Sequence, residues 1–148
     1  MPVRDTLPMA ADSADGAATK PLSGHVVVVA AHTGAARAAV ALTEAGAAVA
    51  VISDEPDAVR IVEENVAGSN PLLAFRADPT DPEVWARVVP HLEQRLGPID
   101  AVAADRESHD AVPTTLLDDL RRRGHGGVVA IEEVEVVSAV IQAIRRTP

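Results

Sequence analysis

Several residues that could do chemistry follow the first apolar run of the sequence. His32, Thr33 and Gly34 come directly after "HVVVVAA" (residues 25–31), and Asp105 ends a later apolar run. A histidine oriented by a carboxylate is an arrangement used for general-base catalysis, and Thr33 is a hydroxyl that could act beside it. One hypothesis is therefore a small enzyme that uses His32 and Asp105.

Two further acids also follow apolar runs. Asp54 comes after "AAVAVIS" (residues 47–53), and Asp78 comes after "PLLAFRA" (residues 71–77). In nucleotide-binding α/β folds an acid after the second strand accepts a hydrogen bond from a ribose hydroxyl. Asp54 could take that role, although Ser53 occupies the more usual position. Asp54 could equally cap the next helix.

The sequence predicts no metal site. The acidic stretch "DRESHD" (residues 105–110) lacks a defined ligand motif and is expected to be a polar, flexible loop. His25, His91 and His125 do not have the spacing of metal ligands. Arg121–Arg123 could bind a phosphate or an acidic partner, but these arginines also complement the dipole at a helix end.

Five short, mostly aliphatic runs are typical of strands buried on both faces of a parallel sheet. Helical patterns lie between these runs, so each pair of consecutive strands is expected to form a right-handed crossover. The predicted strands span residues 25–31, 47–53, 71–77, 99–105 and 126–132.

The predicted helices have clear start and stop signals. The first, over residues 35–45, is ended by Gly46, and a helix that starts at "TDPE" has a capping box in which Thr80 pairs with Glu83. Pro90 is expected to kink or break this helix. The other predicted helices span residues 55–67, 115–123 and 133–146.

These elements predict one α/β domain over residues 23–148, preceded by a disordered tail over residues 1–22. The expected architecture is a three-layer, doubly wound, Rossmann-like domain with a five-stranded parallel sheet of order 3-2-1-4-5. Ligands of such folds bind beyond the carboxyl ends of the strands, where the strand order reverses.

Composition excludes several classes of partner. The formal net charge of −9 and the pI of about 4.9 oppose binding to nucleic acid or to an anionic membrane. The chain has no cysteine, so it can form no disulfide and no thiolate site. No signal peptide and no stretch long enough to span a bilayer is evident, which predicts a cytoplasmic protein.

The chain resembles the short-chain dehydrogenase/reductases over residues 22–146. "PLSGHVVVVAA", "ALTEAGAAVAVIS", "ADPTDPEVWARVV", "LGPIDAVAA" and "LLDDLRRRGHGGVVAIE" are similar, in order, to segments of that family. The resemblance implies a dinucleotide site in which Asp78 stands where a family aspartate touches adenine. His32, Thr33, Gly34 and Asp54 would complete a site for NAD or NADP, bound weakly.

The sequence departs from the family at the glycine-rich turn and at the catalytic residues. Gly34 is the one glycine in a turn where the family has three. The family uses a serine, a tyrosine and a lysine, whereas this chain has no tyrosine, and its one lysine is Lys20 in the predicted tail. Glu132 and Glu133 fill the serine position. The chain is thus identified as a truncated, degenerate member without the family's hydride-transfer chemistry.

The resulting hypothesis is a non-catalytic module that senses a nucleotide or binds another protein. The family's helices beside strands 4 and 5 commonly pair between subunits, which implies a homodimer. An alternative is a receiver-like signalling domain with Asp105 as phosphoacceptor, which requires a strand order of 2-1-3-4-5.

Overall fold

The sheet has the predicted order. The computed structural model describes residues 20–56, 58, 60, 64, 71–125, 128–131 and 135–145. Five strands pair in parallel in the order β3-β2-β1-β4-β5, which confirms the doubly wound Rossmann-like fold and differs from the 2-1-3-4-5 order of a receiver domain. The strands are β1 (Val26–Ala30), β2 (Ala48–Ser53), β3 (Leu72–Arg76), β4 (Ala101–Ala104) and β5 (Val128–Ala130).

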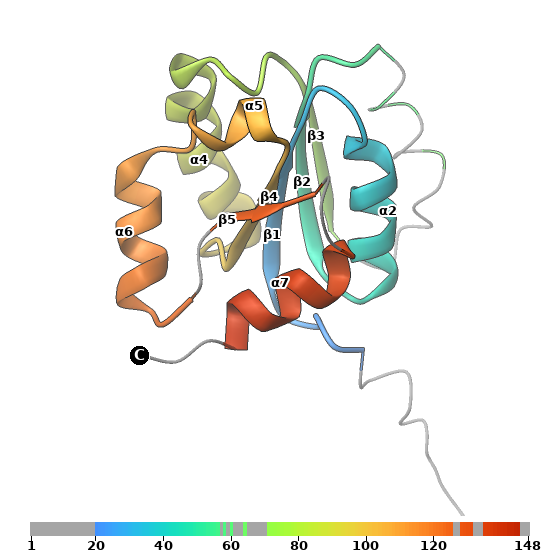
Figure 1. The fold of residues 1–148 in the computed structure, drawn as a ribbon, viewed down its shortest axis with the longest axis vertical. Coiled ribbons are helices and arrows are strands. Elements are labelled where there is room, and N and C mark those ends of the chain that lie inside the picture. The colour runs from blue at the N-terminus through green and yellow to red at the C-terminus, as the bar shows by residue number, and fades with distance from the viewer. Residues whose placement is uncertain are drawn as a thin grey trace, which may run out of the picture.

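Helices cover both faces of this sheet. In Figure 1, α2 and α7 lie on one side of the strands and α4 and α6 on the other. The predicted helix over residues 55–67 falls largely outside the described residues. Within the part of the chain that the structure describes, no helix is long and apolar enough to cross a membrane. The helices are α2 (Ala35–Glu44), α4 (Pro82–Leu96), α5 (Arg106–His109), α6 (Thr114–Arg122) and α7 (Val136–Arg145).

The core consists of two aliphatic clusters, one on each face of the sheet. Alternate residues of a strand point to opposite faces, so Val27 and Val29 pack toward α2 and α7, while Val28 packs toward α4 and α6. Trp85 of α4 is fully buried, and its indole N–H donates to the carbonyl of Pro79 at 2.8 Å. The single tryptophan is thus both a core residue and a satisfied hydrogen-bond donor.

The folded domain begins earlier than the sequence predicted. Leu22 is 1% exposed and packs in the core, and its N–H donates to the carbonyl of Ala45 at 2.9 Å. Leu22 therefore belongs to the domain, and the predicted boundary between residues 22 and 23 lies too far along the chain. The rest of the predicted tail, residues 1–19, lies outside the described residues.

The start of α4 differs from the predicted capping box. The carboxylate of Asp81, not the hydroxyl of Thr80, caps the helix by accepting from the N–H of Glu83 at 2.9 Å. Thr80 instead donates both its N–H and its hydroxyl to Asp78. The helix also continues through Pro90 without the predicted break.

An ionic network joins the elements at the amino edge of the sheet. Asp100, directly before β4, accepts from the N–H of Val26 at 2.9 Å and lies 3.2 Å from both Arg123 and His125. The other ring nitrogen of His125 lies 3.1 Å from the carbonyl of Ile144 in α7. One carboxylate, 15% exposed, thus links β1, the end of α6 and the segment before β5.

Candidate functional site at the carboxyl edge of the sheet

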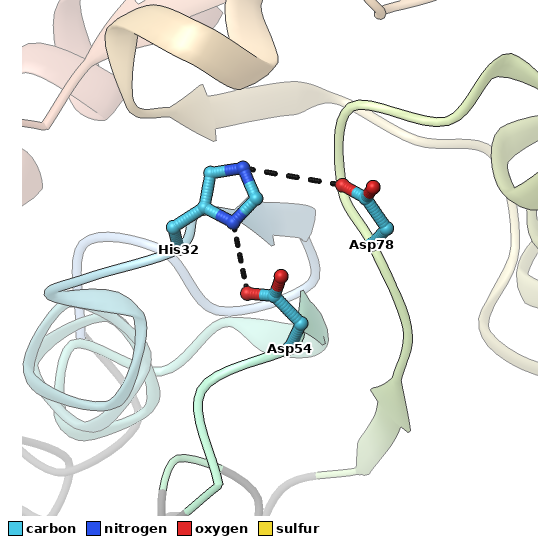
Figure 2. Close-up of side chains that lie close together, drawn as sticks. All are labelled: His32, Asp54 and Asp78. Atoms are coloured by element: carbon cyan, nitrogen blue, oxygen red, sulfur yellow. Dashed lines mark hydrogen bonds and ion pairs between the residues drawn. The ribbon is translucent and has the colours of Figure 1, made fainter.

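Three predicted site residues meet where three neighbouring strands end. His32 follows β1, Asp54 follows β2 and Asp78 follows β3, and Figure 2 shows the imidazole between the two carboxylates. Nδ1 of His32 lies 2.8 Å from Oδ1 of Asp54, and Nε2 lies 3.9 Å from Oδ1 of Asp78. One ligand atom from each residue lies within 4.8 Å of the others, a spacing that could hold a metal ion.

The charges of this cluster act on its titratable groups. The hydrogen bond to Asp54 raises the pKa of His32 above its ordinary value of 6.5, against the opposing effect of partial burial. The Thr80 hydroxyl, and then the Thr80 N–H, lower the pKa of Asp78 below 3.8. Both effects favour the charged forms of His32 and Asp78.

Asp105 has a structural role that differs from both roles predicted for it. Its carboxylate is buried and accepts from the backbone N–H of His32 at 2.7 Å and from the N–H of Ser108 at 2.9 Å. It therefore caps α5, the short helix that replaces the loop predicted over residues 105–110. The carboxylate that hydrogen-bonds to the His32 ring is Asp54, whereas Asp105, the partner expected from the sequence, bonds to the His32 backbone.

Asp54, expected either as a ribose acceptor or as a helix cap, contacts the ring of His32. Its carboxylate is engaged with the His32 ring, whereas the N–H of Glu55 donates to the hydroxyl of Ser53 at 3.2 Å. The helix that Asp54 was expected to cap lies largely outside the described residues. Oδ1 of Asp54 is thus engaged by the His32 ring.

Thr33 and Gly34 lie apart from the His32 ring, at the beginning of α2. Gly34 adopts φ +81° at the N-cap, a conformation that favours glycine, and no side chain caps this helix. Thr33, Gly34 and Arg37 line a cavity of about 420 Å³ that also reaches Ile131 and Glu135. The first-turn N–H groups of α2 are therefore free of a side-chain acceptor beside a basic residue.

Glu107 is a site residue that the sequence did not single out. Its carboxylate, on α5, lies 3.9 Å from Nε2 of His32 and is 74% exposed. The grouping of His32, Asp54 and Asp78 was also missed as a potential metal site. The signal was present in the strand order, because residues directly after three adjacent parallel strands must lie at one edge.

Lys20 does not lie at the carboxyl edge of the sheet. Lys20 is exposed and lies beside Gly46, which precedes β2 at the opposite, amino edge. Glu132 and Glu133 lie outside the described residues. The described part of the chain therefore brings no lysine to the carboxyl edge.

Comparisons with known proteins bear on the fold. No protein-family model and no curated protein matches the sequence. Solved structures do match it, among them a short-chain dehydrogenase/reductase from Mycobacterium ulcerans, with 18% identity and a TM-score of 0.58 over 74% of this chain and 51% of that one.

Two other matching structures are also oxidoreductases of low sequence identity. A citronellol catabolism dehydrogenase from Pseudomonas aeruginosa is 12% identical, with a TM-score of 0.59 over 84% of this chain and 64% of that one. A proposed D-mannonate oxidoreductase from Haemophilus influenza, with NAD bound, is 18% identical, with a TM-score of 0.50 over 59% of this chain and 32% of that one. In all three cases the chain spans less than two thirds of the other protein. The resemblance seen in the sequence is therefore confirmed at the level of structure: this chain has the Rossmann-like fold of the short-chain dehydrogenase/reductases, over part of their length.

Proposed function

We propose that this domain binds an adenine dinucleotide at the carboxyl edge of its sheet and does not catalyse hydride transfer. The observation that carries the proposal is the uncapped beginning of α2 at the switch point between β1 and β4. Free N–H groups and the positive end of the helix dipole favour a phosphate there.

The lining of the adjoining cavity supports this proposal. The cavity is large enough for part of a nucleotide, and Arg37 adds a positive charge beside the helix end. Ala35 is fully buried, which shows that alanine satisfies the close packing of helix on strand at this turn. The residues present therefore fit the phosphate end of a dinucleotide.

Two carboxylates suit the adenosine end. Asp54 can accept from a ribose hydroxyl and Asp78 from the adenine amino group. The negative charge of Asp54 opposes a 2′-phosphate, so NAD is favoured over NADP.

The chain's own residues do not supply the family's proton-transfer chemistry. NAD, when bound, supplies a nicotinamide that accepts or gives a hydride. The sequence has no tyrosine, and Lys20 lies at the other edge of the sheet. A bound dinucleotide would therefore act here as a signal or as a structural ligand.

Thermal shift with NAD, NADP, ATP and a flavin at 1 mM tests the proposal. A Kd of about 100 µM would stabilise the domain by about 1.4 kcal/mol, which raises Tm by roughly 4 °C. We expect NAD to give the largest shift and Arg37→Ala to reduce it. Arg121→Ala, at an exposed arginine paired with Asp118, is the matched control. If none of the four ligands shifts Tm, nucleotide binding is refuted.

A groove between α4 and α6 supports a second candidate function, self-association. Ala86, Val89 and Pro90 are partly or fully exposed and contribute to the lining of this cavity of about 500 Å³. These two helices flank β4 and β5 and pack on one face of the sheet, where the family resemblance implies pairing between subunits. We infer a homodimer formed through this groove.

Sedimentation velocity tests the dimer. The wild-type protein is expected to have twice the monomer mass of 15.4 kDa, and Ala86→Glu, which places a charge on the groove, is expected to be monomeric. Gln94→Glu, an exposed change on the same helix, should leave the dimer intact. A monomeric wild type would refute self-association.

A further inference from the structure

The side chains around His32 carry an inference that does not depend on nucleotide binding. Four carboxylates surround or support one imidazole, because Asp54, Asp78 and Glu107 face the ring and Asp105 holds its backbone. Even with the ring protonated, the local charge is negative. Such an edge attracts a cation more strongly than it attracts an anion.

The distances indicate where a cation would sit. Nε2 of His32 is 3.9 Å from Asp78 and 3.9 Å from Glu107, which is too far for a hydrogen bond in either case. Two atoms bound to one Zn²⁺ at about 2.0–2.2 Å lie roughly 3.4 Å apart in a tetrahedral site. Each carboxylate would therefore need to move by only about half an ångström to share an ion with Nε2, and both side chains are exposed enough to do so.

The other ring nitrogen is already held as it is in metal-binding histidines. An ionised Asp54 can only accept, so the proton of the 2.8 Å hydrogen bond lies on Nδ1. A carboxylate on one ring nitrogen fixes the orientation of the ring and leaves the other nitrogen free to ligate. This bond points Nε2 toward Asp78 (Figure 2).

Asp78 is itself held in place by its own partners. Its Oδ1 accepts from the hydroxyl of Thr80 at 2.6 Å and from the Thr80 N–H at 2.9 Å. The same Oδ1 is the oxygen that lies 3.9 Å from Nε2 of His32, so these bonds fix the carboxylate beside the ring. The Asp78 carboxylate is therefore a preoriented oxygen ligand, whereas Glu107, on an exposed side chain, can adjust its position.

We propose that the carboxyl edge of the sheet holds a first-row divalent cation, with His32 Nε2, Asp78 and Glu107 as ligands and Asp54 as a positioning residue for the His32 ring. One nitrogen and two carboxylate ligands suit Zn²⁺ or Mn²⁺, whereas Mg²⁺ and Ca²⁺ prefer oxygen alone. Water would complete the coordination.

Isothermal titration with ZnCl₂ at pH 7.5, on protein first treated with a chelator, tests this proposal. We expect one site per chain with a micromolar Kd and at least tenfold weaker binding of Mg²⁺. His32→Gln, Asp78→Asn and Glu107→Gln should each weaken Zn²⁺ binding at least tenfold. Asp54→Asn should weaken it by roughly 10-fold to 100-fold, the usual loss when such an orienting partner is removed.

His109→Gln is the matched control. His109 also has a carboxylate nearby, with its Nδ1 3.8 Å from Asp110, but both side chains are at least half exposed, and no third ligand lies beside them among the residues that the structure describes. The change should leave Zn²⁺ binding unaltered. Equal Zn²⁺ affinity of His32→Gln and the wild type would overturn the proposal, as would loss of binding in His109→Gln.

A measurement on the unaltered protein covers the case in which a variant fails to fold. Substoichiometric Mn²⁺ should broaden the imidazole NMR signals of His32 before those of the other histidines. Uniform broadening of all five histidines would contradict a specific site. Asp54 and Asp78 serve both proposed sites, but the cation test is made without nucleotide. Failure of nucleotide binding would therefore leave this result unchanged.

Discussion

Replacement of Asp105 by alanine should lower the stability of the domain more than any exposed aspartate replacement. The change removes the acceptor of two backbone N–H groups, that of His32 at 2.7 Å and that of the buried Ser108 at 2.9 Å. It thereby leaves the turn after β1 and the start of α5 without their common partner. The same carboxylate was a candidate phosphoacceptor and catalytic residue, so the experiment separates a structural role from a chemical one.

The expected loss can be worked from these two hydrogen bonds. A hydrogen bond to a charged acceptor contributes about 1.5–2 kcal/mol, so Asp105→Ala should cost about 3–4 kcal/mol and lower Tm by roughly 10 °C. Asp105→Asn keeps one acceptor oxygen but turns an N–H₂ group toward the other donor. About half of the loss should therefore remain.

Urea unfolding at pH 7 followed by the fluorescence of Trp85 measures the free energy of unfolding directly. Asp110→Ala, at an aspartate whose side chain is 99% exposed, is the control and should change stability by less than about 0.5 kcal/mol. If Asp105→Ala were as mild as this control, the carboxylate would not be the structural link between β1 and α5.

Three other changes test the packing and the electrostatics of the domain. Ser108→Ala should raise stability by about 1 kcal/mol in urea, because the buried Ser108 hydroxyl has no hydrogen-bond partner among the described residues. Gly46→Ala should lower the free energy of unfolding by about 3 kcal/mol, because the new Cβ would lie 2.9 Å from Lys20 Cβ at φ +104°. Gly34→Ala should lower it by about 1 kcal/mol, because its Cβ would lie 3.7 Å from the nearest side chain at φ +81°. Equal losses in the two variants would contradict this comparison. The N–H of Ser138 lowers the pKa of Glu135, so this carboxylate stabilises the fold above its unfolded pKa near 4.5, and the contribution disappears as the pH falls through the lower folded value. Glu135→Gln should therefore be less stable than wild type at pH 7, and the difference should shrink as the pH falls through the folded pKa of Glu135; a difference that does not change with pH would disprove the effect.

The strands and their order could be predicted because their signals are local or follow from general rules. Short aliphatic runs are typical of strands in a parallel sheet, and helical connections between them impose parallel pairing. Errors occurred where several local choices were equivalent. Thr80 and Asp81 are both good cap residues, and the structure uses the aspartate because Asp78 already engages the threonine.

The candidate site could be predicted as a set of residues but not as a set of contacts. Strand β1 lies between β2 and β4, so Asp54 and Asp105 both follow strands adjacent to the one that precedes His32. The strand order brings both acids near the histidine, and side-chain rotation decides which carboxylate meets the ring. In the structure Asp105 takes the backbone N–H, and the ring turns toward Asp54. Such a choice depends on tertiary packing that a sequence pattern does not encode.

The ionic network around Asp100 and the candidate site lie at opposite edges of the sheet. Asp100 bonds to Val26, Arg123 and His125, so the anchoring charges are gathered where the strands begin. The cluster around His32 lies where the strands end, a full strand length away. Exposed carboxylates at the carboxyl edge could therefore be replaced one at a time to change the ligand specificity. The Asp100 network at the amino edge would continue to stabilise the fold.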